Sequence, residues 1–217
     1  MKGLIFDLDG TLLNTIPDIC KALNAVLEDY GFAELTENEV AVYLGNGFRY
    51  LVESALPETK KEELLEEALL KFEYYYSLYY LDDTRPYPGI KVLLQQLQKQ
   101  GYLLAVNSNK KESYAINLLA QFFPEIHFCD VWGMRQGIPG KPNPQAAFAI
   151  LEKMNLSHEE LFYIGDSETD YATAKNAGLP FIAVTWGFRS PEKLQELGVS
   201  QLVYSAQELE KCIQDKK

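Results

Sequence analysis

The sequence predicts an α/β fold with a parallel sheet, interrupted near its start by an all-helical insertion. Short apolar runs alternate with helix-like stretches along most of the chain. Such alternation favours parallel strands joined by right-handed crossovers. The runs that we interpret as strands buried on both faces are residues 4–6, 103–106, 161–164 and 181–184.

Helix-like stretches separate these strands. The stretch 90–100 opens after Pro88-Gly89 and stops at Gly101, and both are typical helix boundary signals. Residues 144–154 form a second such stretch. The chain has 217 residues, which is room for one sizeable α/β domain and a smaller insertion.

The insertion runs from about Thr15 to Leu81, where no convincing strand occurs. Its segment EELLEEALLKFEYYYSLYYL has an apolar stripe at helical spacing, formed by Leu65, Leu69, Phe72, Tyr76 and Tyr79. We interpret this stripe as helix packing with the phenol tips in water. The following DDTRPYPG would be the return linker. The predicted domains are therefore residues 1–14 with 82–217, and residues 15–81.

The overall composition limits the class of partner. The formal net charge is −11, which argues against nucleic acid or an anionic membrane as the main partner. The three cysteines lie far apart in no metal-like spacing, which suits a reducing compartment. No run approaches the roughly 18 apolar residues of a membrane helix, and no cleavable leader is evident. We expect a cytoplasmic protein that is a monomer or a weak homodimer.

Carboxylates follow the first strand and the third. Asp7 and Asp9 are two residues apart in an extended segment, so both can face one cleft. Active sites of parallel sheets lie beyond the carboxyl ends of the strands, which would bring Asp166 and Asp170 nearby. About four carboxylates cannot stay ionised together without a cation. Their hard oxygen atoms suit Mg²⁺.

The remaining polar clusters suit a phosphoryl group. Ser108 and Asn109 follow the second strand, and Lys141 lies in a loop. Gly10 allows close backbone approach to a ligand. Asp7 would then be free to attack phosphorus. Taken alone, each cluster also fits an ordinary turn, loop or helix cap; their order and complementary chemistry favour a shared site.

In this order the clusters resemble the haloacid dehalogenase superfamily of aspartyl-phosphate enzymes. DLDGT resembles its first motif, Ser108 the second, Lys141 the third and GDSETD the fourth. The resemblance implies a Rossmann-like parallel-sheet core domain with an inserted α-helical cap domain.

The resemblance also implies a role for each acidic residue. Asp7 would be nucleophile and Mg²⁺ ligand, and Asp166 would complete the metal shell. Asp9 would be general acid and base and would lend its backbone carbonyl to the metal. Thr11 would help to hold Asp9. Asp170 would support the metal through Lys141 or a water.

The phosphate-binding residues follow from the same motifs. Ser108 and Asn109 would bind phosphate, with Gly10 and Thr11 contributing from the first motif. Lys141 would contact phosphate and offset the charge of the nucleophile. A carboxylate at Asp9 is a feature of the phosphatases of this superfamily and is missing from its dehalogenases.

Within the insertion, LGNGFRYLVESAL resembles the cap segment of phosphoglycolate phosphatase-like proteins. Asn46 lies in a flexible loop that could face the substrate, and Arg49 could pair with a substrate carboxylate. Asn14 departs from the family pattern, which often has an acidic residue there. A solvent-facing Arg49 beside a helix cap is the alternative.

The function expected from these features is a Mg²⁺-dependent phosphatase of small phosphorylated metabolites such as phosphoglycolate. A phosphosugar mutase with the same nucleophile is an alternative, although no specific sugar-binding pattern is present. A non-catalytic phosphate-binding or signalling protein is another. It would have little use for Asp9 or for a helical lid of about 65 residues.

Overall fold

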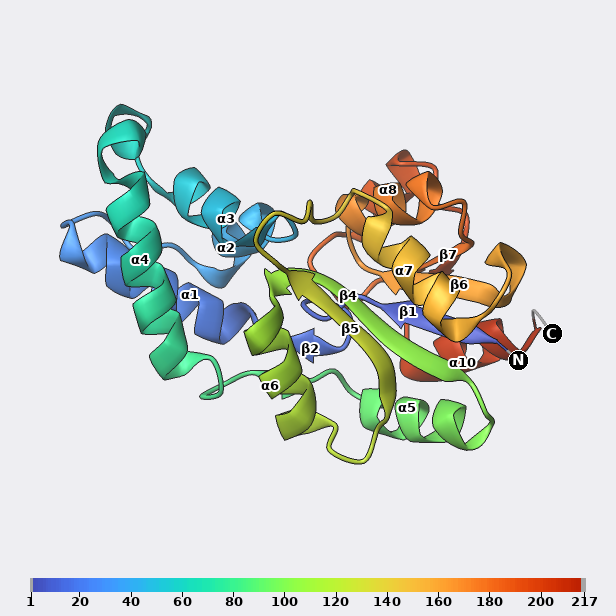
Figure 1. Cartoon of the computed structure of the whole chain (residues 1–217). Helices are drawn as coiled ribbons and strands as arrows, with labels where there is room; N and C mark the ends of the chain where they lie inside the picture. Colours follow the sequence, from blue (N-terminus) through green and yellow to red (C-terminus); the bar gives the residue numbers. More distant parts are fainter. Residues whose placement is uncertain (1, 216–217) are drawn as a thin grey trace. The chain divides into compact units, whose positions relative to one another are not determined.

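The computed structural model describes residues 2–215, and these residues form two compact units (Figure 1). One unit contains the chain up to Leu13 and from Pro86 onward, and the other is Asn14–Arg85. Below they are called the sheet unit and the helical unit. No helix within the described residues is long and apolar enough to cross a membrane.

The sheet unit is built on six parallel strands in the order β5-β4-β1-β6-β7-β8. The strands are β1 (Gly3–Phe6), β4 (Leu103–Lys111), β5 (Phe128–Met134), β6 (Leu161–Gly165), β7 (Phe181–Val184) and β8 (Leu202–Val203). The first strand is central, because β4 joins it on one side and β6 on the other. Ile5 therefore pairs with both Ala105 and Tyr163, and all three are fully buried.

Helices cover both faces of this sheet. They are α5 (Ile90–Lys99), α6 (Glu112–Phe122), α7 (Gln145–Met154), α8 (Glu168–Asn176), α9 (Pro191–Glu196) and α10 (Ala206–Asp215). In Figure 1, α7 and α8 lie on one side of the sheet, and α5 and α10 lie together on the other. A parallel sheet needs both faces covered, since its strands are apolar on both. The predicted Rossmann-like α/β fold is confirmed.

The helical unit consists of α1 (Ile16–Asp29), α2 (Glu37–Tyr43), α3 (Gly47–Ala55) and α4 (Lys61–Tyr79), with a 3₁₀ turn at Glu58–Lys60. An aromatic cluster fills its interior. The ring of Phe48 meets those of Phe72 and Tyr76 edge-on, with centroids 4.9 and 5.1 Å away. Two short strands, β2 (Leu13–Asn14) and β3 (Arg85–Pro86), pair where the chain passes between the units.

Candidate active site

The polar clusters of the sheet unit gather at the carboxyl ends of its three central strands. Asp7 directly follows β1, and Asp166 directly follows β6. Residues 108–110 belong to the last part of β4, which runs further than the sequence indicated. Because parallel strands end at one edge, this topology brings chemistry from distant segments of the chain to one place.

Two donors, one cationic and one neutral, hold a single oxygen of Asp7. Its Oδ1 accepts from the Lys141 ammonium at 2.7 Å and from the Leu8 backbone amide at 2.7 Å. Its Oδ2 has no hydrogen-bond donor among residues 2–215. The residue is only 5% exposed. One oxygen is therefore anchored and the other is available to a ligand.

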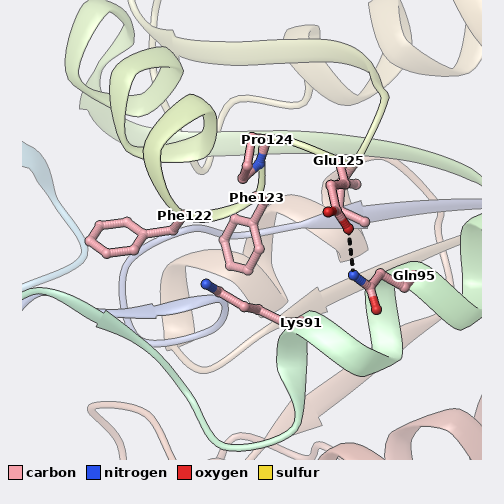
Figure 2. Close-up of a pocket in the computed structure, with 7 residues that line it drawn as sticks. Lys91, Gln95, Phe122, Phe123, Pro124 and Glu125 are labelled. Atoms are coloured by element: carbon pink, nitrogen blue, oxygen red, sulfur yellow. Dashed lines mark hydrogen bonds between the residues drawn. The ribbon is translucent and has the colours of Figure 1, made fainter.

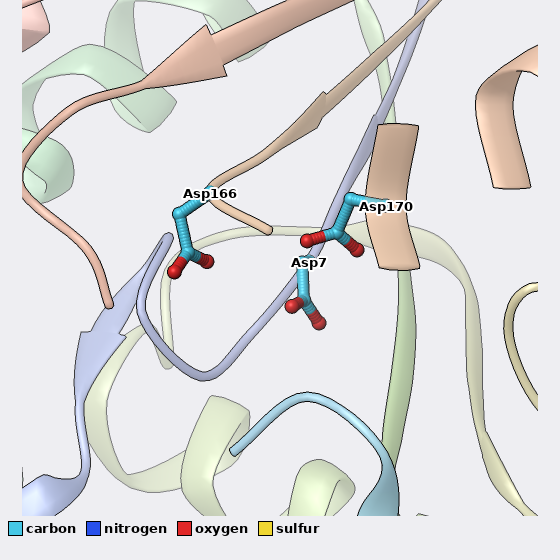
Figure 3. A group of neighbouring side chains, drawn as sticks. All are labelled: Asp7, Asp166 and Asp170. Carbon is cyan, nitrogen blue, oxygen red and sulfur yellow. The ribbon is translucent and has the colours of Figure 1, made fainter. Parts of the chain in front are cut away.

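Asp166 and Asp170 complete a group of three buried carboxylates with Asp7, shown in Figure 3. Ligand oxygens of the three lie within 4.8 Å of one another. Asp170 sits in the first turn of α8, where its Oδ2 accepts from the Ser167 hydroxyl and its Oδ1 from Lys141, both within 2.7 Å. Lys141 thus lies between two of the three carboxylates.

Asp166 is held by neutral donors only. The Thr11 hydroxyl donates to its Oδ1 at 3.0 Å, and the Phe188 amide donates to its Oδ2 at 2.7 Å. The resemblance implied that Thr11 would hold Asp9, and this detail is wrong. Gly10, directly before Thr11, has a φ of 84°, a backbone conformation that glycine adopts readily.

The electrostatics of the group follow from burial and like charge. Burial, and next the charge of Asp170, raise the pKa of Asp7 well above its usual range. The same two causes raise the pKa of Asp166 to about 7. Burial alone would lower the pKa of Lys141, but the charges of Asp170 and Asp7 outweigh it and raise this pKa.

This donor set fits a hard divalent cation. Lys141 pairs with two of the three buried carboxylates, Asp7 and Asp170, so these contacts leave negative charge in the group that is not neutralised. Carboxylate oxygens are the ligands that Mg²⁺ prefers. Asp7 and Asp166 are the residues that would hold the ion. Asp170 is occupied by Lys141 and Ser167, which suits a supporting position.

The end of β4 supplies the neutral and positive groups. Asn109 clamps the lysine loop, because its side chain donates to the Lys141 carbonyl at 3.0 Å and accepts from the Lys141 amide at 2.8 Å. The Ser108 hydroxyl accepts from the Lys110 amide. Ser108 and Asn109 are both buried, and they lie on β4, the strand that pairs with β1.

Several contacts at the site were not foreseen from the sequence. The Lys110 ammonium lies 3.1 Å from Asp9 Oδ1, and its side chain is fully buried. The loop after β7 reaches the site through the Phe188 amide and through Gly187, where a Cβ would lie 2.4 Å from Asp166. The sequence does contain a signal for this loop, since Trp186-Gly187-Phe188-Arg189 closely follows the β7 run, although ordinary loop packing is the interpretation that the sequence alone favours.

The two candidate residues of the insertion lie in the helical unit. Asn46 is the N-cap residue of α3, and Arg49 lies in that helix's first turn. The Arg49 guanidinium is exposed and donates to both oxygens of Glu66 on α4, at 2.7 and 2.9 Å. Arg49 therefore already has an anionic partner that a substrate would have to replace.

A separate cavity of about 200 Å³ lies between α5 and the connection from α6 to β5 (Figure 2). Its lining includes Lys91, Gln95 and Phe123. Gln95 donates to Glu125 there. None of the carboxylates described above lines this cavity, so it is not the candidate active site.

A parallel α/β sheet with carboxylates after β1 and β6 and a buried lysine between them is typical of one class of hydrolases, which the comparison with known families identifies. The chain belongs to the haloacid dehalogenase-like hydrolase family, whose sequence model matches residues 4–184. The family resemblance inferred from the four motifs is therefore confirmed, and the protein is an enzyme.

Relatives of similar length within this family are named phosphoglycolate phosphatases. The chain is 31% identical over 202 residues to a phosphoglycolate phosphatase of Aliivibrio fischeri, covering 90% of this chain and 89% of the relative. It is 32% identical over 195 residues to that of Haemophilus influenzae, covering 86% and 87%. A crystal structure of a Lactobacillus delbrueckii protein, provisionally named a phosphoglycolate phosphatase, superposes with a TM-score of 0.92 at 32% identity, covering 98% and 99%.

Proposed function

We propose that this protein is a Mg²⁺-dependent phosphatase that hydrolyses small phosphate monoesters, phosphoglycolate first among them, through an aspartyl-phosphate. The observation that carries the proposal is the state of Asp7. Its carboxylate is buried, one oxygen is fixed by Lys141 and the Leu8 amide, and the other accepts no hydrogen bond from residues 2–215. A fixed, partly desolvated carboxylate with one open oxygen is suited to nucleophilic attack.

In the first step, Asp7 Oδ2 forms a bond to phosphorus as the bond to the substrate's alcohol oxygen breaks. The departing oxygen keeps the electron pair and takes a proton from the Asp9 carboxyl group. Lys141 and the Ser108 hydroxyl are proposed to offset charge on the phosphoryl oxygens. Asn109 contributes by fixing the backbone of Lys141.

In the second step, Asp9 accepts a proton from a water molecule whose oxygen bonds to phosphorus. The bond to Asp7 breaks, and its carboxylate returns with inorganic phosphate as product. Mg²⁺, held by Asp7 and Asp166, would lower the repulsion between the anionic nucleophile and the anionic phosphoryl group. The Asp9 backbone carbonyl is a further ligand that the family resemblance suggests.

The choice of substrate is supported by the relatives, which are named phosphoglycolate phosphatases. Phosphoglycolate carries a carboxylate besides its phosphate, and Arg49 is the residue proposed to pair with it. Asn46 is proposed to contact the substrate from the same helix start.

The test is phosphate release from a panel of esters, namely phosphoglycolate, sugar phosphates, nucleotides and an aryl phosphate. Each is run with Mg²⁺ and with EDTA, using wild-type protein, Asp7→Asn, and Asp215→Asn as an exposed control on α10. Release that requires both Mg²⁺ and Asp7 supports the proposal. Wild-type rates in Asp7→Asn would refute it.

The same panel addresses the alternative of a phosphosugar mutase. Sugar phosphates are followed for isomerised product as well as for phosphate. Transfer to a sugar that exceeds phosphate release would replace the phosphatase proposal by the mutase. Folded, metal-binding protein that acts on no ester would favour a non-catalytic phosphate-binding role.

A further inference from the structure

Lys110 is a second buried lysine at the candidate site, besides the one that the family motifs explain. Its side chain is fully buried, and its ammonium lies 3.1 Å from Oδ1 of Asp9, whose side chain is 17% exposed. A buried ammonium is costly unless it is paired, so this contact is a stable part of the folded site. Because its side chain is fully buried, Lys110 is not an ordinary solvent-exposed lysine.

The backbone of β4 is shaped to direct this side chain. Asn107 pairs with Trp132 and Lys111 pairs with Met134, so three residues of β4 lie opposite the single residue Gly133. Such irregularities bend a strand and redirect its side chains, and they are frequent beside active sites. Gly133 is required for this arrangement, because a Cβ there would lie 2.3 Å from the backbone of the first residue of α6.

Asp9 has two chemically equivalent oxygens, but only one can exchange a proton with the substrate in a given geometry. An unrestrained carboxylate rotates about its last side-chain bond and presents either oxygen. Proton transfer in a transition state depends on position, and a small misplacement is costly. A group that holds one oxygen therefore fixes the direction of the other.

We propose that Lys110 is a positioning residue for Asp9: its buried ammonium holds Oδ1, so that Oδ2 exchanges the proton with the leaving oxygen of the substrate. This inference rests on the proposed phosphatase function. In the forward step the O–H bond at Oδ2 breaks and the proton bonds to the departing alcohol oxygen, which carries the electron pair from phosphorus. Lys110 keeps its own protons throughout.

The consequence is a dependence on the leaving group. An alkyl alcohol such as that of phosphoglycolate leaves poorly without a proton, whereas a nitrophenolate leaves without one. Because kcat/KM reports the steps up to phosphoryl transfer, it isolates the step in which Asp9 acts as acid. Loss of the Lys110 contact should therefore lower kcat/KM for the alkyl ester far more than for the aryl ester.

The experiment compares kcat/KM for phosphoglycolate and 4-nitrophenyl phosphate at saturating Mg²⁺ in wild type, Lys110→Met, Lys110→Arg and Lys91→Met. Lys110→Met should lose about 10- to 100-fold on phosphoglycolate and less than about threefold on the aryl ester. Lys110→Arg, which retains charge and donors, should restore part of the ratio. Lys91→Met, an exposed change on α5, should alter neither value.

A double-variant cycle identifies the partner through which Lys110 acts. Asp9→Asn should show the same dependence on the leaving group, and Lys110→Met added to it should cause no further loss. Thermal unfolding of each variant with Mg²⁺ identifies variants that do not fold, in which case Lys110→Gln replaces Lys110→Met.

Two results would overturn the proposal while leaving the phosphatase intact. One is an equal loss on both esters in folded Lys110→Met, and the other is a full additional loss in the double variant. Wild-type protein that releases no phosphate from either ester would refute the phosphatase proposal and this inference with it.

Discussion

Removing the charge of Lys141 should destabilise the protein strongly, and more so at high pH. The Lys141 ammonium lies 2.7 Å from Asp7 and 2.7 Å from Asp170, and its side chain is 2% exposed. In Lys141→Met the methionine side chain fills most of the space of the lysine methylene groups, so little packing is lost. The two buried carboxylates, however, lose their cation. Breaking a buried ion pair from one side costs about 3–5 kcal/mol, so we expect a loss of that size in unfolding free energy at pH 8 without metal.

The dependence on pH follows from the raised pKa values. Asp166, with a pKa of about 7, holds a proton at pH 5 and releases it toward pH 8. Burial and the charge of Asp170 also raise the pKa of Asp7. Lys141 is charged at both pH values, because its pKa is raised. Its loss therefore leaves fewer unpaired negative charges at pH 5, and the destabilisation there should be smaller by 1 kcal/mol or more, as an order-of-magnitude estimate.

The assay is urea unfolding in EDTA at pH 5 and pH 8, with wild type, Lys141→Met and Lys91→Met. The last variant changes an exposed lysine by the same substitution and should shift stability by less than about 0.5 kcal/mol. A loss below about 1 kcal/mol in Lys141→Met at pH 8, or an equal loss at both pH values, would refute the electrostatic reasoning.

Four further predictions follow from single residues. Gly10→Ala should lower stability and Mg²⁺ affinity by more than Gly101→Ala. The φ angles of the two glycines are similar, +84° and +82°, but only at Gly10 would a Cβ meet Asp166, at 2.4 Å. Urea unfolding and calorimetry measure the two effects, and equal effects would contradict the prediction. Mg²⁺ binding should tighten from pH 6 to pH 8, since the ion must displace the proton of Asp166, whose pKa is about 7; calorimetric titrations that give one affinity at both pH values would contradict it. Without metal, the same raised pKa should make stability fall as pH rises from about 4 to 7, since the folded state then holds the extra proton. Arg49→Ala should raise KM for phosphoglycolate and leave an aryl phosphate nearly unchanged, and the loss of its exposed ion pair with Glu66 should cost less than about 1 kcal/mol; a similar KM change on both esters would remove its role in specificity.

The strands that could be predicted are those buried on both faces. Residues 161–164 and 181–184 are unbroken apolar runs because helices cover both sides of the sheet there, and β6 and β7 begin at the same residues. The edge of the sheet gave no such signal. β5 is only partly buried along its length and mixes polar, glycine and aromatic residues, so its pattern is neither continuous nor alternating.

The membership of the site could be predicted better than its internal contacts. Asp7, Asp166 and Asp170 lie together because strand order brings their segments to one edge. Lys141 lies in a loop that the Asn109 side chain holds, and it pairs with Asp7 and Asp170. The direction of Lys110 could not be predicted. It depends on the mismatch between β4 and β5, and this becomes visible only when the register of both strands is known.

The charges of the site also bear on why a divalent cation, in particular, suits it. Lys110 balances Asp9, and Lys141 is shared between Asp7 and Asp170, while only neutral groups hold Asp166. With Asp9 protonated for its role as acid and the other three carboxylates ionised, the two lysines leave one negative charge. A divalent cation makes the site positive, whereas a monovalent cation only makes it neutral. A phosphate dianion would be repelled by the negative site and attracted by the positive one. The proposed Mg²⁺ dependence is therefore one of substrate binding as well as of chemistry. We expect inorganic phosphate to raise the temperature of thermal unfolding in Mg²⁺ and to have no such effect in EDTA.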